Sequence, residues 1–109
     1  MSLVSDMLSE ERDRLLQTIK FYHKKIREFP KGAVVKKTIY NKSYGYLNYR
    51  QNGKHHSDYI GVYGSDKIKE LKDKIKERKK YESLLKKTEE NLKEVQRYID
   101  AGKSRKRKV

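Results

Sequence analysis

The first apolar pattern of the chain lies between residues 6 and 29 and has the period of an α-helix. Its members recur at intervals of seven, four, three, four and three residues, which places them on one stripe of a helix. Ser5 or Ser9 is expected to cap the start. Pro30 is expected to end the helix, because proline lacks an amide donor and disfavours helical conformation in the residue before it. The members of the stripe are Leu8, Leu15, Ile19, Tyr22, Ile26 and Phe29.

A second helical pattern runs from residue 65 to residue 101 without an internal proline or glycine. Ser65 is expected to cap its start and Gly102 to end it. The two helices would pack antiparallel as a coiled-coil-like hairpin. Because the second helix is longer by roughly a dozen residues, its last apolar side chains need a second copy of the chain or stay exposed. These side chains are Leu92, Val95 and Ile99.

Residues 33–61, between the two helices, carry the composition of β-strands and turns. An Asn-Gly pair at residues 52–53 is the strongest short-range hairpin signal, because both residues tolerate positive φ. Residues 41–43 are expected to form the other turn. The prediction is an α+β fold with a three-stranded antiparallel β-meander inserted between the helices, and a disordered basic tail at 102–109, all in a single domain. The expected strands are 33–40, 44–50 and 54–60.

A two-residue turn at 52–53 also predicts which side chains share a face of the sheet, because it pairs Arg50 with His55. One face would carry Tyr44, Tyr46, Asn48, Arg50, His55, Ser57 and Tyr59, joined by Lys36, Thr38 and Tyr40 if the first turn has three residues. The other face is expected to pack on the helices. It would carry Gly45, Leu47, Tyr49, His56, Asp58 and Ile60, joined by Val35, Lys37 and Ile39. A two-residue first turn would exchange the two faces of the first strand.

Charge changes the picture, because the chain carries a formal net charge of +14 at pH 7. Polyanions are the expected partners of so basic a protein. The excess lies in two places: residues 30–61 have six Lys or Arg against one Asp, and residues 102–109 have five against none. The central stretch also holds five of the nine tyrosines. Basic and aromatic side chains together are typical of nucleic-acid contacts.

The sequence therefore predicts a nucleic-acid-binding protein, with DNA favoured, that uses the basic, tyrosine-rich face of the sheet. Lys36, Tyr46, Arg50 and Lys54 are the strongest candidates for contacts, and the tail would add non-specific affinity. The full candidate set is Lys36, Thr38, Tyr44, Tyr46, Asn48, Arg50, Lys54, His55, Ser57, Tyr59, Lys103, Arg105, Lys106, Arg107 and Lys108.

Two alternatives remain open on the sequence. Tyrosines in strands commonly serve packing, so the sheet could be purely structural. The protein would then be a helical interaction module whose dimer contacts are Leu92, Val95 and Ile99. RNA is the other alternative, because basic and aromatic content does not separate it from DNA.

Catalysis, metal binding and cofactor binding are not expected. His55 and His56 are adjacent in a strand and point to opposite faces, so they do not form a joint metal site. No nucleophile–base pair or phosphate-binding glycine loop occurs, and no acidic cluster accompanies the basic sheet. No small-molecule substrate and no membrane are expected as partners. Since cysteine is absent, we expect a cytoplasmic protein, associated with the nucleoid if its source is prokaryotic.

The central stretch contains four short motifs, which are Pro30-Lys31-Gly32, Tyr44-x-Tyr46-Leu47-x-Tyr49-Arg50, Gly53-Lys54 and Ser57-x-Tyr59-Ile60-Gly61. With these motifs it resembles a domain-of-unknown-function family of short bacterial and archaeal proteins. The order of strands is also similar to the three-stranded arm-type DNA-binding domain of tyrosine recombinases, which are proteins of mobile elements. Gly45 stands where an aromatic residue is usual in the first family. The resemblance to the recombinases implies DNA binding without strand cleavage.

Overall fold

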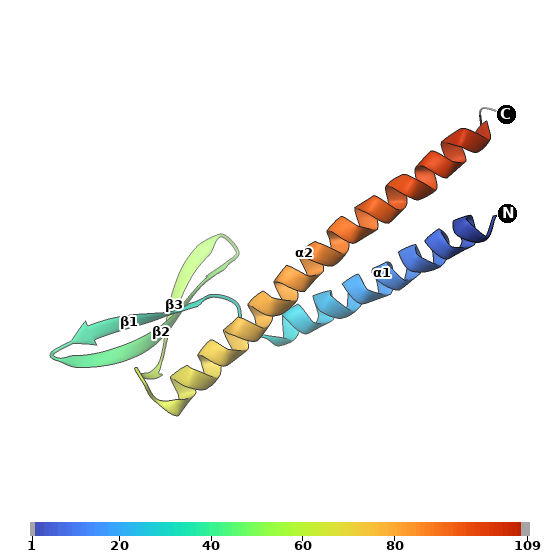
Figure 1. The fold of residues 1–109 in the computed structure, drawn as a ribbon. Helices are drawn as coiled ribbons and strands as arrows, with labels where there is room; N and C mark the ends of the chain where they lie inside the picture. The colour runs from blue at the N-terminus through green and yellow to red at the C-terminus, as the bar shows by residue number, and fades with distance from the viewer. Residues whose placement is uncertain (1, 108–109) are drawn as a thin grey trace. The chain divides into compact units, whose positions relative to one another are not determined.

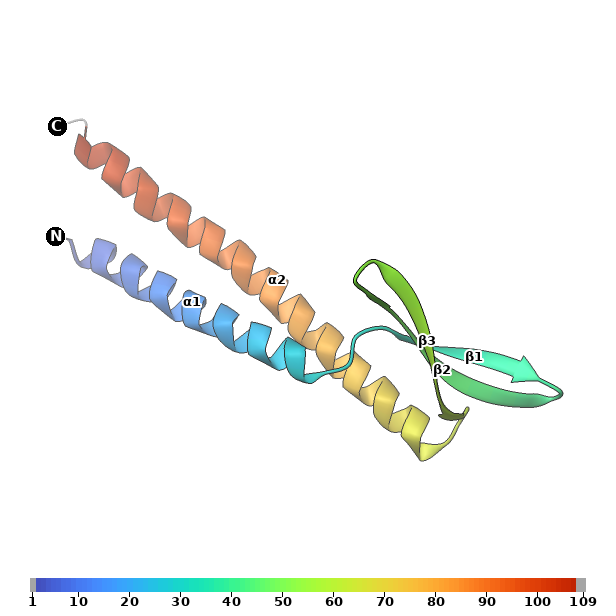
Figure 2. The same cartoon turned by 180° about the vertical axis from the view of Figure 1, so that it is seen from behind.

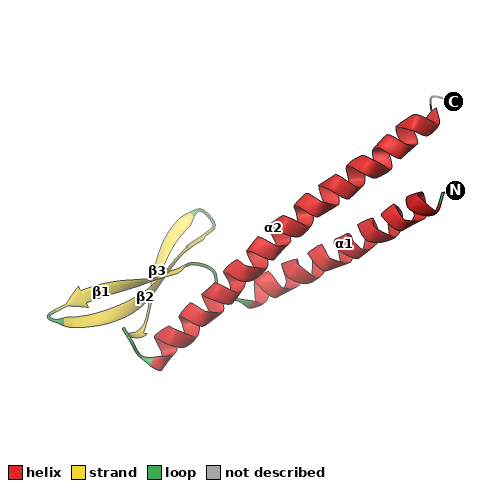
Figure 3. Cartoon of the chain, viewed as in Figure 1, coloured by secondary structure: helices red, strands yellow, loops and turns green. Residues whose placement is uncertain are grey.

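The computed structural model describes the backbone of residues 2–107 and the side chains of residues 2–103. Two helices and three strands follow one another in the order that the sequence predicts (Figure 1, Figure 3). The predicted α+β layout with a three-stranded antiparallel meander is confirmed. The elements are α1 (Leu3–Glu28), β1 (Ala33–Ile39), β2 (Lys42–Gln51), β3 (Lys54–Val62) and α2 (Asp66–Arg107).

The chain forms two compact units. Met1–Ile26 and Tyr81–Val109 make up one, which we call the helical unit, and Arg27–Lys80 make up the other, which we call the sheet unit. Helix α2 contributes its first part to the sheet unit and its second part to the helical unit.

In the helical unit α1 runs antiparallel to the second part of α2, and the two lie side by side in both views (Figure 1, Figure 2). The Tyr22 and Tyr81 rings, with centroids 6.0 Å apart, meet at one end of the pair. Leu15 is 4% exposed and Thr88 is 9% exposed, so both lie in the interface. Thr88 satisfies its buried hydroxyl by donating to the Leu84 carbonyl oxygen at 2.7 Å, the usual arrangement for threonine inside a helix.

The last apolar residues of α2, Leu92, Val95 and Ile99, are half-buried, and Ile99 lines a groove together with Leu8 of α1. Their role as dimer contacts stays a prediction. The sequence prediction assumed that α1 packs against α2 from the first residue of α2, which left the end of α2 without a partner helix. In the structure residues 66–80 of α2 belong to the sheet unit, so only its second part pairs with α1.

Both helix ends of this unit differ from the prediction. α1 begins at Leu3, and the Ser2 hydroxyl accepts the Ser5 amide at 3.1 Å, so Ser2 is the cap rather than Ser5 or Ser9. α2 continues through Gly102 to Arg107. Glycine weakens a helix by about 1 kcal/mol relative to alanine but does not forbid it. Residues 102–107 of the predicted disordered tail are therefore helical, and residues 108–109 lie outside the described residues.

The sheet unit contains an antiparallel sheet in the order β1-β2-β3. The Asn52-Gly53 turn forms as predicted, with φ of 54° and 76°. It produces the predicted pairs of Arg50 with His55, Asn48 with Ser57 and Tyr46 with Tyr59. A β-bulge beyond this last pair shifts the register, so that Gly45 pairs with Gly61.

The first turn differs from the prediction. It has two residues, Tyr40 and Asn41, with φ of 49° and 65°, and β1 pairs with β2 from Ile39–Lys42 to Ala33–Asn48. Two central residues with positive φ are typical of a type I′ hairpin turn. The faces of β1 are therefore the reverse of those predicted. Val35, Lys37 and Ile39 lie on the face with Tyr44 and Tyr46, and Lys36 and Thr38 lie on the opposite face.

The core of the sheet unit forms where α2 crosses the sheet. Ile68 of α2 is 1% exposed and Ile75 is 7% exposed. A Cβ built on Gly45 would lie 2.2 Å from Ile68 Cδ1, so α2 packs directly on the backbone of β2. Arg78 of α2 also donates to the Phe29 carbonyl oxygen at 2.8 Å. That bond satisfies one of the carbonyl groups left free where α1 ends.

Candidate nucleic-acid interface

The face of the sheet that points away from Ile68 is called here the outer face. Strand alternation and the observed register place thirteen side chains on it. They are Ala33, Val35, Lys37, Ile39, Lys42, Tyr44, Tyr46, Asn48, Arg50, His55, Ser57, Tyr59 and Val62. All seven face residues predicted from β2 and β3 lie on it.

Three tyrosines form a cluster on the outer face. The Tyr59 ring centroid lies 6.0 Å from that of Tyr44 and 5.6 Å from that of Tyr46, and both ring pairs meet edge to face. Tyr59 is 51% exposed, while Tyr44 and Tyr46 are half-buried. Aromatic pairs prefer this geometry, which holds the rings in place and leaves part of the cluster open to a ligand.

Cations border the tyrosine cluster. The Lys37 ammonium lies 4.3 Å from the centroid of the Tyr46 ring, a cation–π contact. Arg50 and His55 pair across β2 and β3 near the hairpin end, and both are exposed. The outer face thus combines stacking surfaces with donors for phosphate or base edges.

Asn48 is a partial exception on this face. Its Oδ1 atom is buried and has no hydrogen-bond partner among the described residues. An asparagine reads adenine through both its carbonyl oxygen and its amide group. The side chain would have to rotate before it could make that contact.

Three of the predicted contact residues lie elsewhere. Lys36 is on the helix-facing side, with its ammonium 5.3 Å from the centroid of the Tyr63 ring. Thr38 lies on the same side, and its hydroxyl is 3.3 Å from that of Ser43. Lys54 is exposed beside the 52–53 turn. The predicted positions of Lys36 and Thr38 on the outer face were wrong because the first turn is one residue shorter than expected.

The same error misplaced two further residues, Lys37 and Tyr40. Lys37 was predicted to face the helices but lies against Tyr46 on the outer face. Tyr40, in the first turn, is 96% exposed despite its size. Positive φ at a bulky residue costs conformational energy, so Tyr40 adds backbone strain to the first turn. Asn41 was the one available signal, because asparagine favours positive φ and reads equally well as the second residue of a two-residue turn.

The basic tail belongs to the helical unit. Lys103 is exposed and lines a groove between the ends of α1 and α2. Arg105, Lys106 and Arg107 have a helical backbone, but their side chains lie outside the described residues, as does the whole of Lys108.

Two tyrosines on the helix-facing side have opposite electrostatic surroundings. The Tyr49 hydroxyl donates to Asp58 at 2.9 Å, and this bond, then desolvation and the negative charge of Asp58, raise the pKa of Tyr49. The Tyr63 hydroxyl accepts from the Lys72 ammonium at 2.8 Å. That bond, then the positive charges of Lys72 and Lys36, lower the pKa of Tyr63 against the smaller effect of desolvation.

Within residues 2–103 no group of three or more His, Cys, Asp or Glu side chains lies close enough together to hold a metal ion. No helix in the described part of the chain is long and apolar enough to cross a membrane. No family model, curated protein or solved structure matches this chain, so the family resemblances stay predictions.

Proposed function

We propose that the protein binds duplex DNA through the outer face of its sheet, without catalysing a reaction. The observation that carries the proposal is the cluster of Tyr44, Tyr46 and Tyr59 with Lys37 beside it, on the side of the sheet that α2 does not cover. Arg50 lies further along β2 on the same face. A purely structural sheet face does not need exposed cations beside partly exposed aromatic rings. The absence of cysteine supports a cytoplasmic site of action.

The dimensions of the sheet favour DNA over RNA. Three strands about 4.8 Å apart span roughly 10 Å from β1 to β3, and the major groove of B-form DNA is about 12 Å wide. The major groove of A-form RNA is deep and narrow, and side chains do not reach its bases. A face of this width therefore suits duplex DNA.

Fluorescence anisotropy with a labelled duplex of about 20 base pairs tests the proposal. Each phosphate contact adds about 0.9 to the slope of log affinity against log salt. We expect the Lys37→Gln/Arg50→Gln variant to weaken binding by about tenfold or more and to reduce the slope by about 2.

The matched control is Lys93→Gln/Arg97→Gln, which removes the same charge from exposed positions of α2 in the helical unit. The proposal fails if both double variants change affinity and slope alike. A tighter complex with duplex RNA than with duplex DNA would instead favour the RNA alternative.

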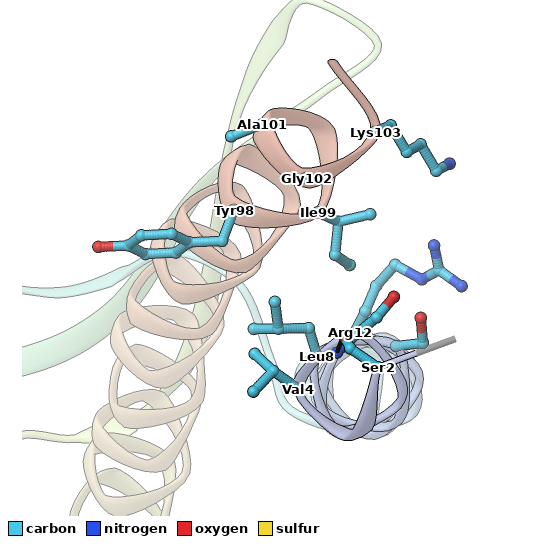
Figure 4. Close-up of a pocket in the computed structure, with 11 residues that line it drawn as sticks. Ser2, Val4, Leu8, Arg12, Tyr98, Ile99, Ala101, Gly102 and Lys103 are labelled. Carbon is cyan, nitrogen blue, oxygen red and sulfur yellow. Dashed lines mark hydrogen bonds between the residues drawn. The ribbon is translucent and has the colours of Figure 1, made fainter. Parts of the chain in front are cut away.

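A second candidate function, self-association through the helical unit, rests on a separate observation. The ends of α1 and α2 enclose a groove of about 630 Å³, with Leu8 and Ile99 pointing towards each other across it (Figure 4). Leu3, Met7 and Tyr98, near the same ends, are 75%, 59% and 62% exposed. A second copy of the chain would cover this apolar surface.

Analytical ultracentrifugation over a range of protein concentrations tests this second candidate. If a dimer forms here, Met7→Glu should shift it towards monomer, because a charge would be buried in an apolar contact. Gln17→Glu, at an exposed polar position of α1, is the control. A monomer at all concentrations excludes self-association.

A further inference from the structure

Three lysines border a groove between α2 and the start of β1 in the sheet unit. The groove has a volume of about 280 Å³ and is lined by Ala33, Val34, Lys72, Ile75, Lys76 and Lys79. The lysines follow one another at helical positions i, i+4 and i+7, so they lie on one side of α2. All three are exposed. We call Lys72, Lys76 and Lys79 the lysine row.

The members of the lysine row differ in what holds them. The Lys72 ammonium donates to the Tyr63 hydroxyl at 2.8 Å and lies 4.5 Å from the centroid of that ring, which fixes its position. Among the described side chains no carboxylate forms an ion pair with Lys76 or Lys79. Like charges one turn apart repel each other, so a bound anion would relieve this repulsion.

The groove lies beside the strand at the edge of the sheet. β1 pairs on one side only, with β2, and its residues Ala33 and Val34 line the groove. With the outer face in a major groove about 12 Å wide, a sheet of roughly 10 Å leaves a sugar–phosphate strand along each edge. One of the two strands then runs past β1.

The length of the lysine row suits such a strand. Seven residues separate Lys72 from Lys79, which is about 10 Å along a helix axis. Nucleotides in one strand follow at about 3.4 Å along the duplex axis, so the row covers about three nucleotide steps.

We infer that the lysine row is a second binding site, whose ligand is the phosphodiester backbone beside the β1 edge. The inference rests on the proposed function and adds a contact surface on α2 to the one on the outer face. Lys72, positioned by Tyr63, would bind a phosphate with little loss of side-chain freedom, and Lys76 and Lys79 would order on binding.

The test removes the two lysines of the row for which the described residues provide no hydrogen bond or ion pair. Lys76→Gln/Lys79→Gln is compared with Lys67→Gln/Lys74→Gln, which removes the same charge from exposed positions on the opposite side of the same part of α2. With a labelled duplex of about 20 base pairs, we expect the first variant to lose about tenfold in affinity and about 2 in salt slope. The control should lose less than half of either amount. Far-UV circular dichroism checks that both variants keep their helices.

A second measurement uses the unmodified protein, so it does not depend on the folding of a variant. Lysine acetylation followed by mass spectrometry should show duplex DNA protecting Lys76 and Lys79 more than Lys67 and Lys74. Polyglutamate at the same charge concentration should not give this pattern. Equal protection of both pairs, or the same pattern with polyglutamate, overturns the inference.

The outcomes separate this inference from the proposed function. If the duplex binds and Lys76→Gln/Lys79→Gln behaves like its control, the lysine row fails and the outer face stands. If Lys76→Gln/Lys79→Gln loses affinity while Lys37→Gln/Arg50→Gln does not, the lysine row stands and the outer face fails. If the protein binds no duplex, both fail.

Discussion

The two faces of the sheet are built from alternate residues of the same strands, yet they differ in side-chain size and in packing. On the helix-facing side Gly45 lies directly under Ile68, and no Cβ fits between the strand and α2. On the outer face its neighbours Tyr44 and Tyr46 carry large rings that meet Tyr59. The helix-facing side is close-packed against α2, whereas the outer face carries its large side chains on a side that α2 does not cover. A glycine within an aromatic strand can therefore mark the side of a sheet that packs on a helix, and so identify the opposite face as the one that the helix leaves uncovered.

Gly45→Ala should give the largest effect, because it disturbs the close-packed side. The added methyl group would lie 2.2 Å from Cδ1 of Ile68, which is 1% exposed, so Ile68 would have to shift within the core, and overpacking of this kind costs up to about 3 kcal/mol. Urea unfolding measures the loss. Gly61→Ala is the control, since its Cβ would meet only Ser65 Oγ, at an ordinary 3.5 Å.

A double variant sharpens this prediction. Ile68→Val removes the Cδ1 methyl group that the new Cβ would strike, so Gly45→Ala/Ile68→Val should recover part of the lost stability. Strictly additive losses in the two single variants would show that Ile68 is not the obstacle.

Tyr59→Leu should give the next largest effect, and on binding rather than on stability. The change keeps apolar bulk but removes a ring that is 51% exposed on the outer face. The Tyr59 hydroxyl can donate to a phosphate, and a hydrogen bond to a charged group contributes about 1.5–3 kcal/mol, so we expect duplex affinity to fall by about tenfold in the anisotropy assay. Tyr98→Leu, at a tyrosine of the helical unit that is 62% exposed, should leave affinity unchanged. A loss of stability without a loss of affinity would mean that the outer face only packs.

A change in the first turn should give a smaller effect, and it should stabilise the protein rather than destabilise it. Replacing Tyr40-Asn41 by Asn-Gly (Tyr40→Asn/Asn41→Gly) puts favoured residues at two positions of positive φ. We expect the free energy of unfolding to rise by about 0.5–1 kcal/mol. If the exposed Tyr40 ring contacts DNA, the same variant will bind more weakly, and anisotropy will detect it. Unchanged stability would contradict the strain argued for Tyr40.

The smallest effects concern the titration of two tyrosines on the helix-facing side. By ¹³C NMR of labelled tyrosine, Tyr63 should titrate below the ordinary tyrosine pKa of about 10, and Tyr49 above it. Asp58→Asn should lower the pKa of Tyr49, and Lys72→Met should raise that of Tyr63.

These two shifts affect stability in different ranges of pH. Tyr49 has a raised pKa, so its contribution is complete below about pH 10 and is lost as the pH rises through its own pKa. Tyr63 has a lowered pKa, so its contribution is complete above about pH 10 and is lost as the pH falls through its own pKa. Titration of both tyrosines at one midpoint would contradict the two hydrogen bonds.

The order of elements and the register of β2 with β3 could be predicted from the sequence, because they depend on local signals. Apolar period predicts the helices, and the Asn-Gly pair at 52–53 predicts one hairpin. Seven of the outer-face residues of β2 and β3 followed from that turn alone. For the helices and the β2–β3 hairpin, preferences of residues close together in the sequence were sufficient for the prediction.

The register of β1 could not be predicted in the same way. Tyr40 has no turn preference, and the choice between a turn at 40–41 and one at 41–43 depends on how the finished sheet packs on α2. The continuation of α2 beyond Gly102 and the groove that Ile99 lines with Leu8 were missed for a similar reason. Each depends on which part of α2 pairs with α1, and that is a property of the tertiary structure.

The bulge in β3 allows one strand to place Tyr59 on the outer face and to direct Tyr63 to the helix-facing side. Tyr59, Gly61 and Tyr63 occupy alternate positions and would all point the same way in a regular strand. The bulge between the Tyr46–Tyr59 and Gly45–Gly61 pairs reverses this parity, so Tyr59 joins the outer face while Tyr63 meets Lys72 on the other side. The residues before and after the bulge each supply side chains to both faces of the sheet. A deletion of Ile60 would remove the extra residue of the bulge and leave both segments on their present faces, whereas a one-residue deletion elsewhere in β3 would reverse the faces of one segment. Deletion of Ile60 should therefore be the best tolerated single-residue deletion in this strand.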